Sequence, residues 1–185
     1  AGPTWQQLPQ PVLKQDSAAI LVFDLSPSML AEDISPSRLV RARFKLIDIL
    51  NSRREGFTAL VVYGGEAHTV SPLTEDNNTI ISLVPILHPT LLPEYGSNTE
   101  EAVAMAIELA ANGGYEQADI ILISDGENHD EEVIQIAEKI KEDGIVVYSV
   151  GIGSEKGVMI PEYVNGKKVG WKKDKQGSAV VSRLN

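Results

Sequence analysis

The stretch that decides the fold of this chain is Ile20-Leu21-Val22-Phe23-Asp24-Leu25-Ser26-Pro27-Ser28. Residues 18–23 carry no polar side chain, and an apolar run without alternation is typical of a strand buried on both faces of a parallel sheet. Asp24 is therefore expected at the carboxyl end of this strand, where open α/β sheets bind ligands. The pattern Asp-x-Ser-x-Ser supplies oxygen donors that suit Mg²⁺. An ordinary turn is the alternative, because Asp, Ser and Pro are also common turn residues.

A second apolar strand, residues 120–123, also ends in a carboxylate, that of Asp125 in Ser124-Asp125-Gly126. Strands that alternate with helices predict a three-layer α/β/α fold, doubly wound, with a mostly parallel sheet. In such a sheet the first strand commonly lies beside one formed much later in the chain. We therefore expect Asp24 and Asp125 to meet at one edge of the sheet and to share a divalent ion.

Two local patterns refine this architecture. Gly64-Gly65 separates two strand-like runs, which predicts a hairpin and one antiparallel strand at a sheet edge. Asn165-Gly166 predicts a second hairpin in a Lys-rich stretch.

The helix that follows the first strand is expected to begin with Ser35 as N-cap and Pro36 as its first residue. Its basic residues, Arg38 among them, are expected on a face that is solvated or docks an acidic partner. Asn98 and Glu101 predict a capping box at the start of a later helix.

Composition excludes several classes of function. The chain has 185 residues, which suits one domain, and no cysteine, which excludes disulfides, thiolate metal sites and a cysteine nucleophile. A net charge of −10 argues against a nucleic-acid partner. The charge is uneven, because residues 155–185 hold seven basic and three acidic residues. The acidic remainder favours cations or basic partner surfaces.

These motifs together resemble the von Willebrand factor A (VWA) domain family with its metal-ion-dependent adhesion site. The family pattern is Asp-x-Ser-x-Ser after the first strand, a Thr that opens a central helix, and Asp-Gly after the fourth strand. The resemblance places metal ligands at Asp24, Ser26, Ser28 and Asp125. The family's Gly-Thr-Asn stands here as Gly-Ser-Asn at 96–98, so the Thr hydroxyl falls on Ser97, with Thr99 as a second candidate.

The segment Met29-Leu30-Ala31-Glu32-Asp33, followed by Ser37-Arg38-Leu39, is most similar to bacterial Bat-type proteins. The resemblance to the VWA family covers residues 17–154, which are expected to form a Rossmann-like core. Residues 1–16 contain several Pro and Gln and no periodicity, so they are expected to form an extended lead-in. Residues 155–185 are expected to form a Lys-rich hairpin or insertion that leads to a truncated end, because the family continues into a last helix and edge strand.

The resemblance also implies a non-catalytic domain that binds another protein through Mg²⁺, or through another divalent cation such as Mn²⁺ or Ca²⁺. A partner Asp or Glu would complete the metal shell. Expected companions are TPR-containing Bat-type proteins and a MoxR-type AAA+ ATPase. The full-length protein is expected in the cell membrane, anchored by flanking segments that this chain lacks, with this domain in the periplasm.

Two other functions stay open. A phosphatase of the haloacid dehalogenase type would use Asp24 as its nucleophile beside Mg²⁺. That family needs a second Asp where Ser26 stands, so the general acid would be missing. The other is a scaffold domain with a vestigial metal site.

Overall fold

The computed structural model describes residues 17–126, 130–141, 144–164 and 167–184. Its central sheet has the strand order β3-β2-β1-β4-β5. Only the β2–β3 pair is antiparallel among these strands, so the predicted mostly parallel sheet with one antiparallel edge strand is confirmed. The strands are β1 (Ala18–Asp24), β2 (Phe57–Tyr63), β3 (Ala67–Thr74), β4 (Ala118–Ser124) and β5 (Ile145–Gly151).

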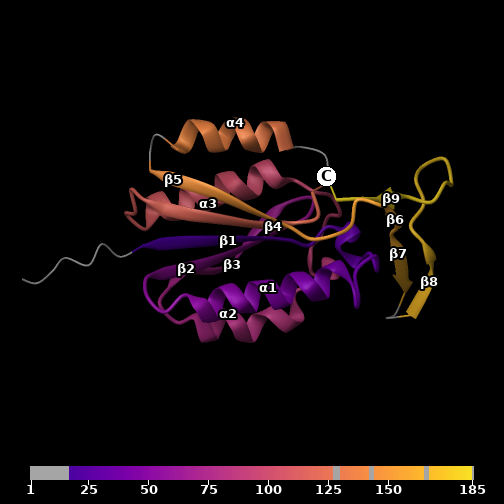
Figure 1. Cartoon of the computed structure of the whole chain (residues 1–185), viewed down its shortest axis with the longest axis horizontal. Helices are drawn as coiled ribbons and strands as arrows, with labels where there is room; N and C mark the ends of the chain where they lie inside the picture. The colour runs from indigo at the N-terminus through magenta and orange to yellow at the C-terminus, as the bar shows by residue number, and fades with distance from the viewer. Residues whose placement is uncertain (1–16, 127–129, 142–143, 165–166, 185) are drawn as a thin grey trace, which may run out of the picture.

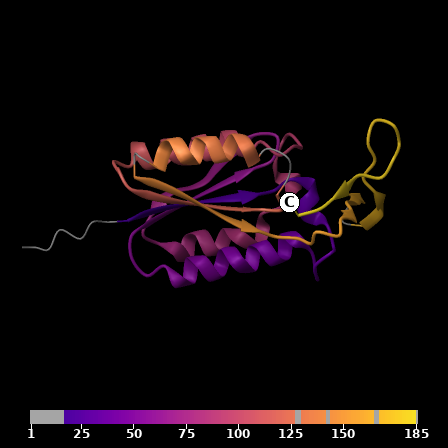
Figure 2. The same cartoon turned by 45° about the horizontal axis from the view of Figure 1, so that its top comes forward.

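Helices cover both faces of this sheet, which confirms the predicted three layers (Figures 1 and 2). One face carries α1 (Arg38–Ser52) and α2 (Asn77–Leu83), and the other carries α3 (Thr99–Asn112) and α4 (Asp130–Lys141). Short 3₁₀ helices lie in the connections: η1 (Pro27–Leu30), η2 (Val84–Ile86) and η3 (Pro89–Leu91).

The position of β1 explains its apolar sequence. All of its residues are buried. Ile20 and Val22 pack in the core on the α3 side, whereas Leu21 and Phe23 pack in the core on the α1 side. Successive side chains of a strand point to opposite faces, so a strand covered on both faces needs an apolar side chain at every position.

The first helix begins later than the sequence predicts. Its N-cap is Ser37, whose hydroxyl accepts a hydrogen bond from the Val40 backbone N–H at 3.3 Å. The prediction of Ser35 as cap and Pro36 as first helical residue is wrong, since both precede the helix. The Arg38 backbone N–H donates to the carbonyl of Ala31, so contact with the preceding turn determines where α1 begins.

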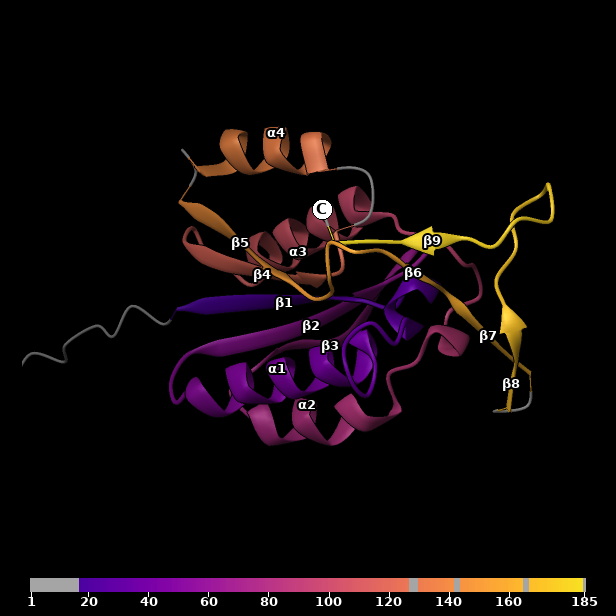
Figure 3. The ribbon, with the colours of Figure 1, turned by 45° about the vertical axis from the view of Figure 1, so that its right-hand side comes forward.

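Residues 155–164 and 167–184 form what we call the basic arm, after its surplus of Lys. Figure 3 shows it projecting from the end of the sheet toward which β1 and β4 run. The predicted hairpin strands are present, but Asn165-Gly166 and the lead-in 1–16 lie outside the described residues. Two strand pairs build the arm: β6 (Val158–Met159) with β9 (Val181–Ser182), and β7 (Pro161–Val164) with β8 (Lys167–Trp171).

Among the described residues, no helix is both long and apolar enough to cross a membrane.

Candidate metal centre

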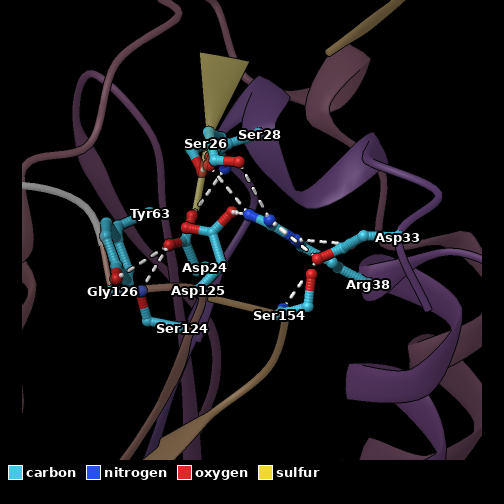
Figure 4. Close-up of polar contacts among 11 residues, drawn as sticks. Asp24, Ser26, Ser28, Asp33, Arg38, Tyr63, Ser124, Asp125, Gly126 and Ser154 are labelled. Carbon is cyan, nitrogen blue, oxygen red and sulfur yellow. Dashed lines mark hydrogen bonds and ion pairs between the residues drawn. The ribbon is translucent and has the colours of Figure 1, made fainter. Parts of the chain in front are cut away.

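Asp24 ends β1 and is fully buried. Its Oδ1 accepts a hydrogen bond from the Ser26 backbone N–H at 2.7 Å, and its Oδ2 accepts from the hydroxyls of Ser124 at 2.8 Å and Tyr63 at 3.2 Å (Figure 4). Burial and the negative charge of Asp125 raise the pKa of Asp24 to about 7, although Ser26 and Ser124 oppose the rise. These neutral donors orient the carboxylate without neutralising it.

Asp125 meets Asp24 because β4 pairs directly with β1, with Phe23 opposite Ile123. Figure 4 shows both carboxylates in one cluster, and the expected meeting of the two strand ends is confirmed. Asp125 is fully buried, and its Oδ2 accepts a hydrogen bond from the Arg38 guanidinium at 2.7 Å. Its Oδ1 has no hydrogen-bond partner within the described part of the chain. Burial raises the pKa of Asp125, and Arg38 opposes that rise.

Ser26 and Ser28 add two hydroxyls directly after β1. Both are buried, and their Oγ atoms lie 2.7 Å apart. The chain turns there into η1, in which the Met29 backbone N–H donates to the Ser26 carbonyl. This turn brings the two hydroxyls to the same edge as Asp24, and Ser28 also lowers the pKa of Asp125 against the effect of burial. The ordinary turn and the oxygen cluster therefore coexist in one stretch.

The segment before α3 carries the remaining predicted ligand, Ser97. The Oγ of Ser97 is buried and has no hydrogen-bond partner within the described residues. Thr99, the second candidate, already donates its hydroxyl to Tyr63 at 3.4 Å. Asn98 accepts a hydrogen bond from the Glu101 backbone N–H at 3.2 Å, which confirms Asn98 as the N-cap. The Glu101 carboxylate accepts from the Asn98 side-chain amide at 2.9 Å and not from its backbone N–H, so the reciprocal half of the predicted capping box is not formed. The free hydroxyl is therefore that of Ser97.

Close backbone packing holds this segment in place. The Asn98 backbone N–H donates to the Gly64 carbonyl at 2.7 Å, and the Gly65 N–H donates to the Glu94 carbonyl at 3.1 Å. A Cβ atom at Gly96 would lie 2.8 Å from the Cα of Gly65, closer than real Cβ atoms approach backbone. The glycine pair between β2 and β3 thus also makes room for the chain that carries Ser97.

The donor set fits a hard divalent cation. Two carboxylates, Asp24 and Asp125, and three neutral hydroxyls, Ser26, Ser28 and Ser97, are the oxygen ligands that Mg²⁺ prefers. A buried polar atom left without a partner costs about 1–3 kcal/mol, and coordination would satisfy both Asp125 Oδ1 and Ser97 Oγ. The described residues hold no group of three or more His, Cys, Asp or Glu that could bind a metal, so a site here needs its hydroxyls.

Two side chains that contact Asp24, those of Tyr63 and Ser124, were not predicted. Tyr63 stands opposite Asp24 in the β1–β2 register, and Ser124 directly precedes Asp125. Tyr63 ends β2 and Ser124 ends β4, and these two strands flank β1. A polar residue at the carboxyl end of a strand is the sequence signal that could have identified both.

Arg38 was predicted on the solvated or partner-docking face of α1, and this prediction is wrong. Its side chain is fully buried and forms ion pairs with Asp33 at 2.9 Å and Asp125 at 2.7 Å. Asp33 is only five residues away, but the acceptors Asp125 and Ser182 come from distant segments, so the local sequence does not distinguish Arg38 from the exposed Arg41. An arginine is rarely fully buried in a protein unless, as here, carboxylates pair with its charge.

Comparisons with known proteins agree with this architecture. A model of the von Willebrand factor type A domain matches residues 19–127. The chain is similar to the solved structure of the conserved hypothetical protein BatB from Bacteroides thetaiotaomicron, with 32% identity and a TM-score of 0.80 over 91% of this chain and 80% of that chain. It is also similar to an aerotolerance-related membrane protein from Bacteroides fragilis NCTC 9343, with 29% identity and a TM-score of 0.76 over 92% and 82% of the two chains.

The SpRpn10 VWA domain, at 18% identity and a TM-score of 0.57 over 74% of each chain, supports the fold alone. A search of the curated proteins found no match. The family model covers more than half of the chain, and the BatB structure is similar to it in both sequence and fold. The chain therefore belongs to the von Willebrand factor type A domain family.

Proposed function

We propose that this domain is a non-catalytic module that binds another protein through a divalent cation, with Mg²⁺ as the first candidate. Asp24, Ser26, Ser28, Ser97 and Asp125 would hold the ion. The observation that carries the proposal is the unpartnered, buried Oδ1 of Asp125 beside the buried carboxylate of Asp24. Two buried carboxylates in one cluster need positive charge, and Arg38 occupies only one of their oxygens.

The chain's own residues prepare this site. Ser124 and Tyr63 orient Asp24, and Arg38 holds Asp125 by one oxygen so that the other stays free. A bound ion supplies a centre of positive charge that prefers oxygen ligands and keeps water on its open side. With few strong protein ligands, the ion retains affinity for a carboxylate, so the partner is expected to contribute an Asp or Glu.

The cellular setting is also a proposal. Similarity to BatB and to an aerotolerance-related membrane protein supports a Bat-type protein anchored in the membrane by segments outside this chain, with this domain in the periplasm. TPR-containing Bat-type proteins and a MoxR-type AAA+ ATPase are the partners to test first.

The surroundings of Asp24 argue against the phosphatase. The side chain is fully buried among orienting donors, whereas a nucleophile must reach a phosphorus atom of the substrate. Ser26 stands where this class of phosphatase needs an Asp as general acid, and its hydroxyl is hydrogen-bonded to that of Ser28. We therefore expect no Mg²⁺-dependent turnover of a generic phosphoester.

Metal titration with partner capture tests the proposed function. We expect the wild type to bind Mg²⁺ in calorimetry and to retain a candidate partner in Mg²⁺ but not in EDTA. Asp24→Ala and Asp125→Ala should lose both properties, whereas Asp48→Ala, which changes an exposed aspartate on α1, should keep both. Partner retention that is the same in EDTA and in the Asp24→Ala variant would contradict the mechanism. Phosphoester turnover that Asp24→Asn abolishes would favour the enzyme.

A further inference from the structure

The basic arm is anchored at the end of the sheet that carries the candidate metal centre (Figures 1 and 3). One anchor lies at the surface. The Glu32 carboxylate accepts hydrogen bonds from the Tyr163 hydroxyl and the Lys168 ammonium, each at 2.8 Å. These groups are partly exposed, and ion pairs that water reaches contribute little to stability. This anchor alone leaves the arm only weakly held.

The second anchor is Arg38, and it is buried. Its Nη1 donates to the Ser182 hydroxyl of the arm at 2.8 Å and to Asp125 Oδ2 at 2.7 Å. Its Nη2 donates to the Ser182 carbonyl at 3.3 Å and to Asp33 at 3.0 Å, and its Nε donates to Asp33 at 2.9 Å. A guanidinium has five N–H groups, and these contacts use all of them.

Further contacts support the same connection. Asp33 accepts a hydrogen bond from the Ser154 backbone N–H at 2.7 Å, and the Ser154 carbonyl accepts one from the Leu184 N–H at 3.0 Å. Ser154, the residue directly before the arm, and Ser182 near its other end therefore both contact the Arg38–Asp33 pair. In these contacts between described residues, only the Arg38 side chain is hydrogen-bonded both to a proposed metal ligand, Asp125, and to the arm, at Ser182.

We infer that Arg38 is a positioning residue that links the arm to the metal centre: the docked arm holds the guanidinium, and the guanidinium holds Asp125 with its free oxygen directed to the cation. This inference rests on the proposed function. Cation binding and arm docking then favour each other, and thermodynamic linkage requires the same factor in both directions. A partner that holds or displaces the arm would thereby raise or lower the affinity for the ion.

Replacement of Ser182, the arm residue that contacts Arg38, tests whether arm docking strengthens Mg²⁺ binding. Ser182→Ala removes the hydroxyl that accepts from Arg38 and leaves every proposed metal ligand in place. We expect calorimetry to show Mg²⁺ affinity about fivefold weaker than in the wild type. Ser178→Ala is the matched control, because Ser178 lies in the same arm without a contact to Arg38, and its affinity should be unchanged. Arg38→Lys keeps the charge but not the five-donor fork, and should weaken binding at least tenfold.

Hydrogen exchange tests whether Mg²⁺ binding strengthens arm docking. A variant that is only less stable would not reproduce this result. Mg²⁺ should slow exchange of the backbone N–H groups at residues 180–184 about fivefold in the wild type, and not in Asp24→Ala. Wild-type affinity in Ser182→Ala, with no effect of Mg²⁺ on exchange in the arm, would overturn the linkage and leave the proposed function standing. Absence of Mg²⁺ binding to the wild type would overturn both.

Discussion

The two buried carboxylates differ in how their charge is balanced. Asp125 has an ion pair with Arg38, whereas Asp24 has only neutral donors. Burial and the charge of Asp125 accordingly raise the pKa of Asp24 to about 7. A group whose pKa is higher in the folded than in the unfolded state stabilises the fold less as pH rises between the two values. For Asp24 this interval runs from its ordinary value of 3.8 to about 7.

We therefore predict that the metal-free protein loses stability between pH 5 and pH 8 through Asp24. In EDTA, the loss from this group should be about 2–3 kcal/mol in the free energy of unfolding. Asp24→Asn keeps the shape of the side chain without the charge, so its stability should depend much less on pH. Urea unfolding at the two pH values measures both proteins. Equal pH dependence in wild type and variant would contradict this account of Asp24.

Asp33 behaves in the opposite way. Burial alone would raise the pKa of Asp33, but hydrogen bonds from Arg38 and Ser154 lower it to about 2. Its stabilising effect is therefore present above its ordinary value of 3.8 and is lost as pH falls toward 2.

We predict that Asp33→Asn destabilises the protein by about 1–2 kcal/mol at pH 7 and by roughly half as much at pH 3. Urea unfolding at both pH values tests this, with the exposed Asp48→Asn as the control that should change little. A difference between wild type and Asp33→Asn that stays constant down to pH 3 would refute the interpretation.

Among the helices, α3 has a cap that also borders the candidate site. Asn98 caps the helix and directly follows Ser97, and its backbone N–H is bonded to Gly64. At α2 the cap is Asp76, which accepts from the Asn78 backbone N–H at 3.0 Å and is not among the residues of the site. Both caps accept a hydrogen bond from a backbone N–H, but only the α3 cap directly follows a proposed metal ligand.

Loss of either cap should cost about 1 kcal/mol of stability. We predict that only Asn98→Ala also weakens Mg²⁺ binding, by roughly three- to tenfold, because the Ser97 hydroxyl loses its fixed position. Thermal unfolding and calorimetry on Asn98→Ala and Asp76→Ala separate the two effects. Equal affinity for Mg²⁺ in the two variants would show that the α3 cap does not position Ser97.

For the domain in its entirety, a ligand that binds only the folded state must stabilise it. At a Mg²⁺ concentration about 100 times the dissociation constant, the gain is about 2.7 kcal/mol. For a chain of this length we predict a rise in the midpoint of thermal unfolding of about 5–10 °C. Scanning calorimetry with Mg²⁺ and with EDTA measures it. Asp125→Ala should show no rise, and a rise of similar size in that variant would place the ion elsewhere.

The apolar run of β1 and the two strand-end carboxylates are enough, in linear order, to predict a doubly wound sheet with Asp24 beside Asp125. Those features are local, because a strand covered on both faces must be apolar at every position and must end where polarity returns. The start of α1 and the burial of Arg38 could not be predicted this way. Arg38 is buried because Asp33, Asp125 and Ser182 supply its acceptors. Asp33 is close to Arg38 in the chain, but Asp125 and Ser182 are 87 and 144 residues away, so only packing in three dimensions brings all three to one guanidinium.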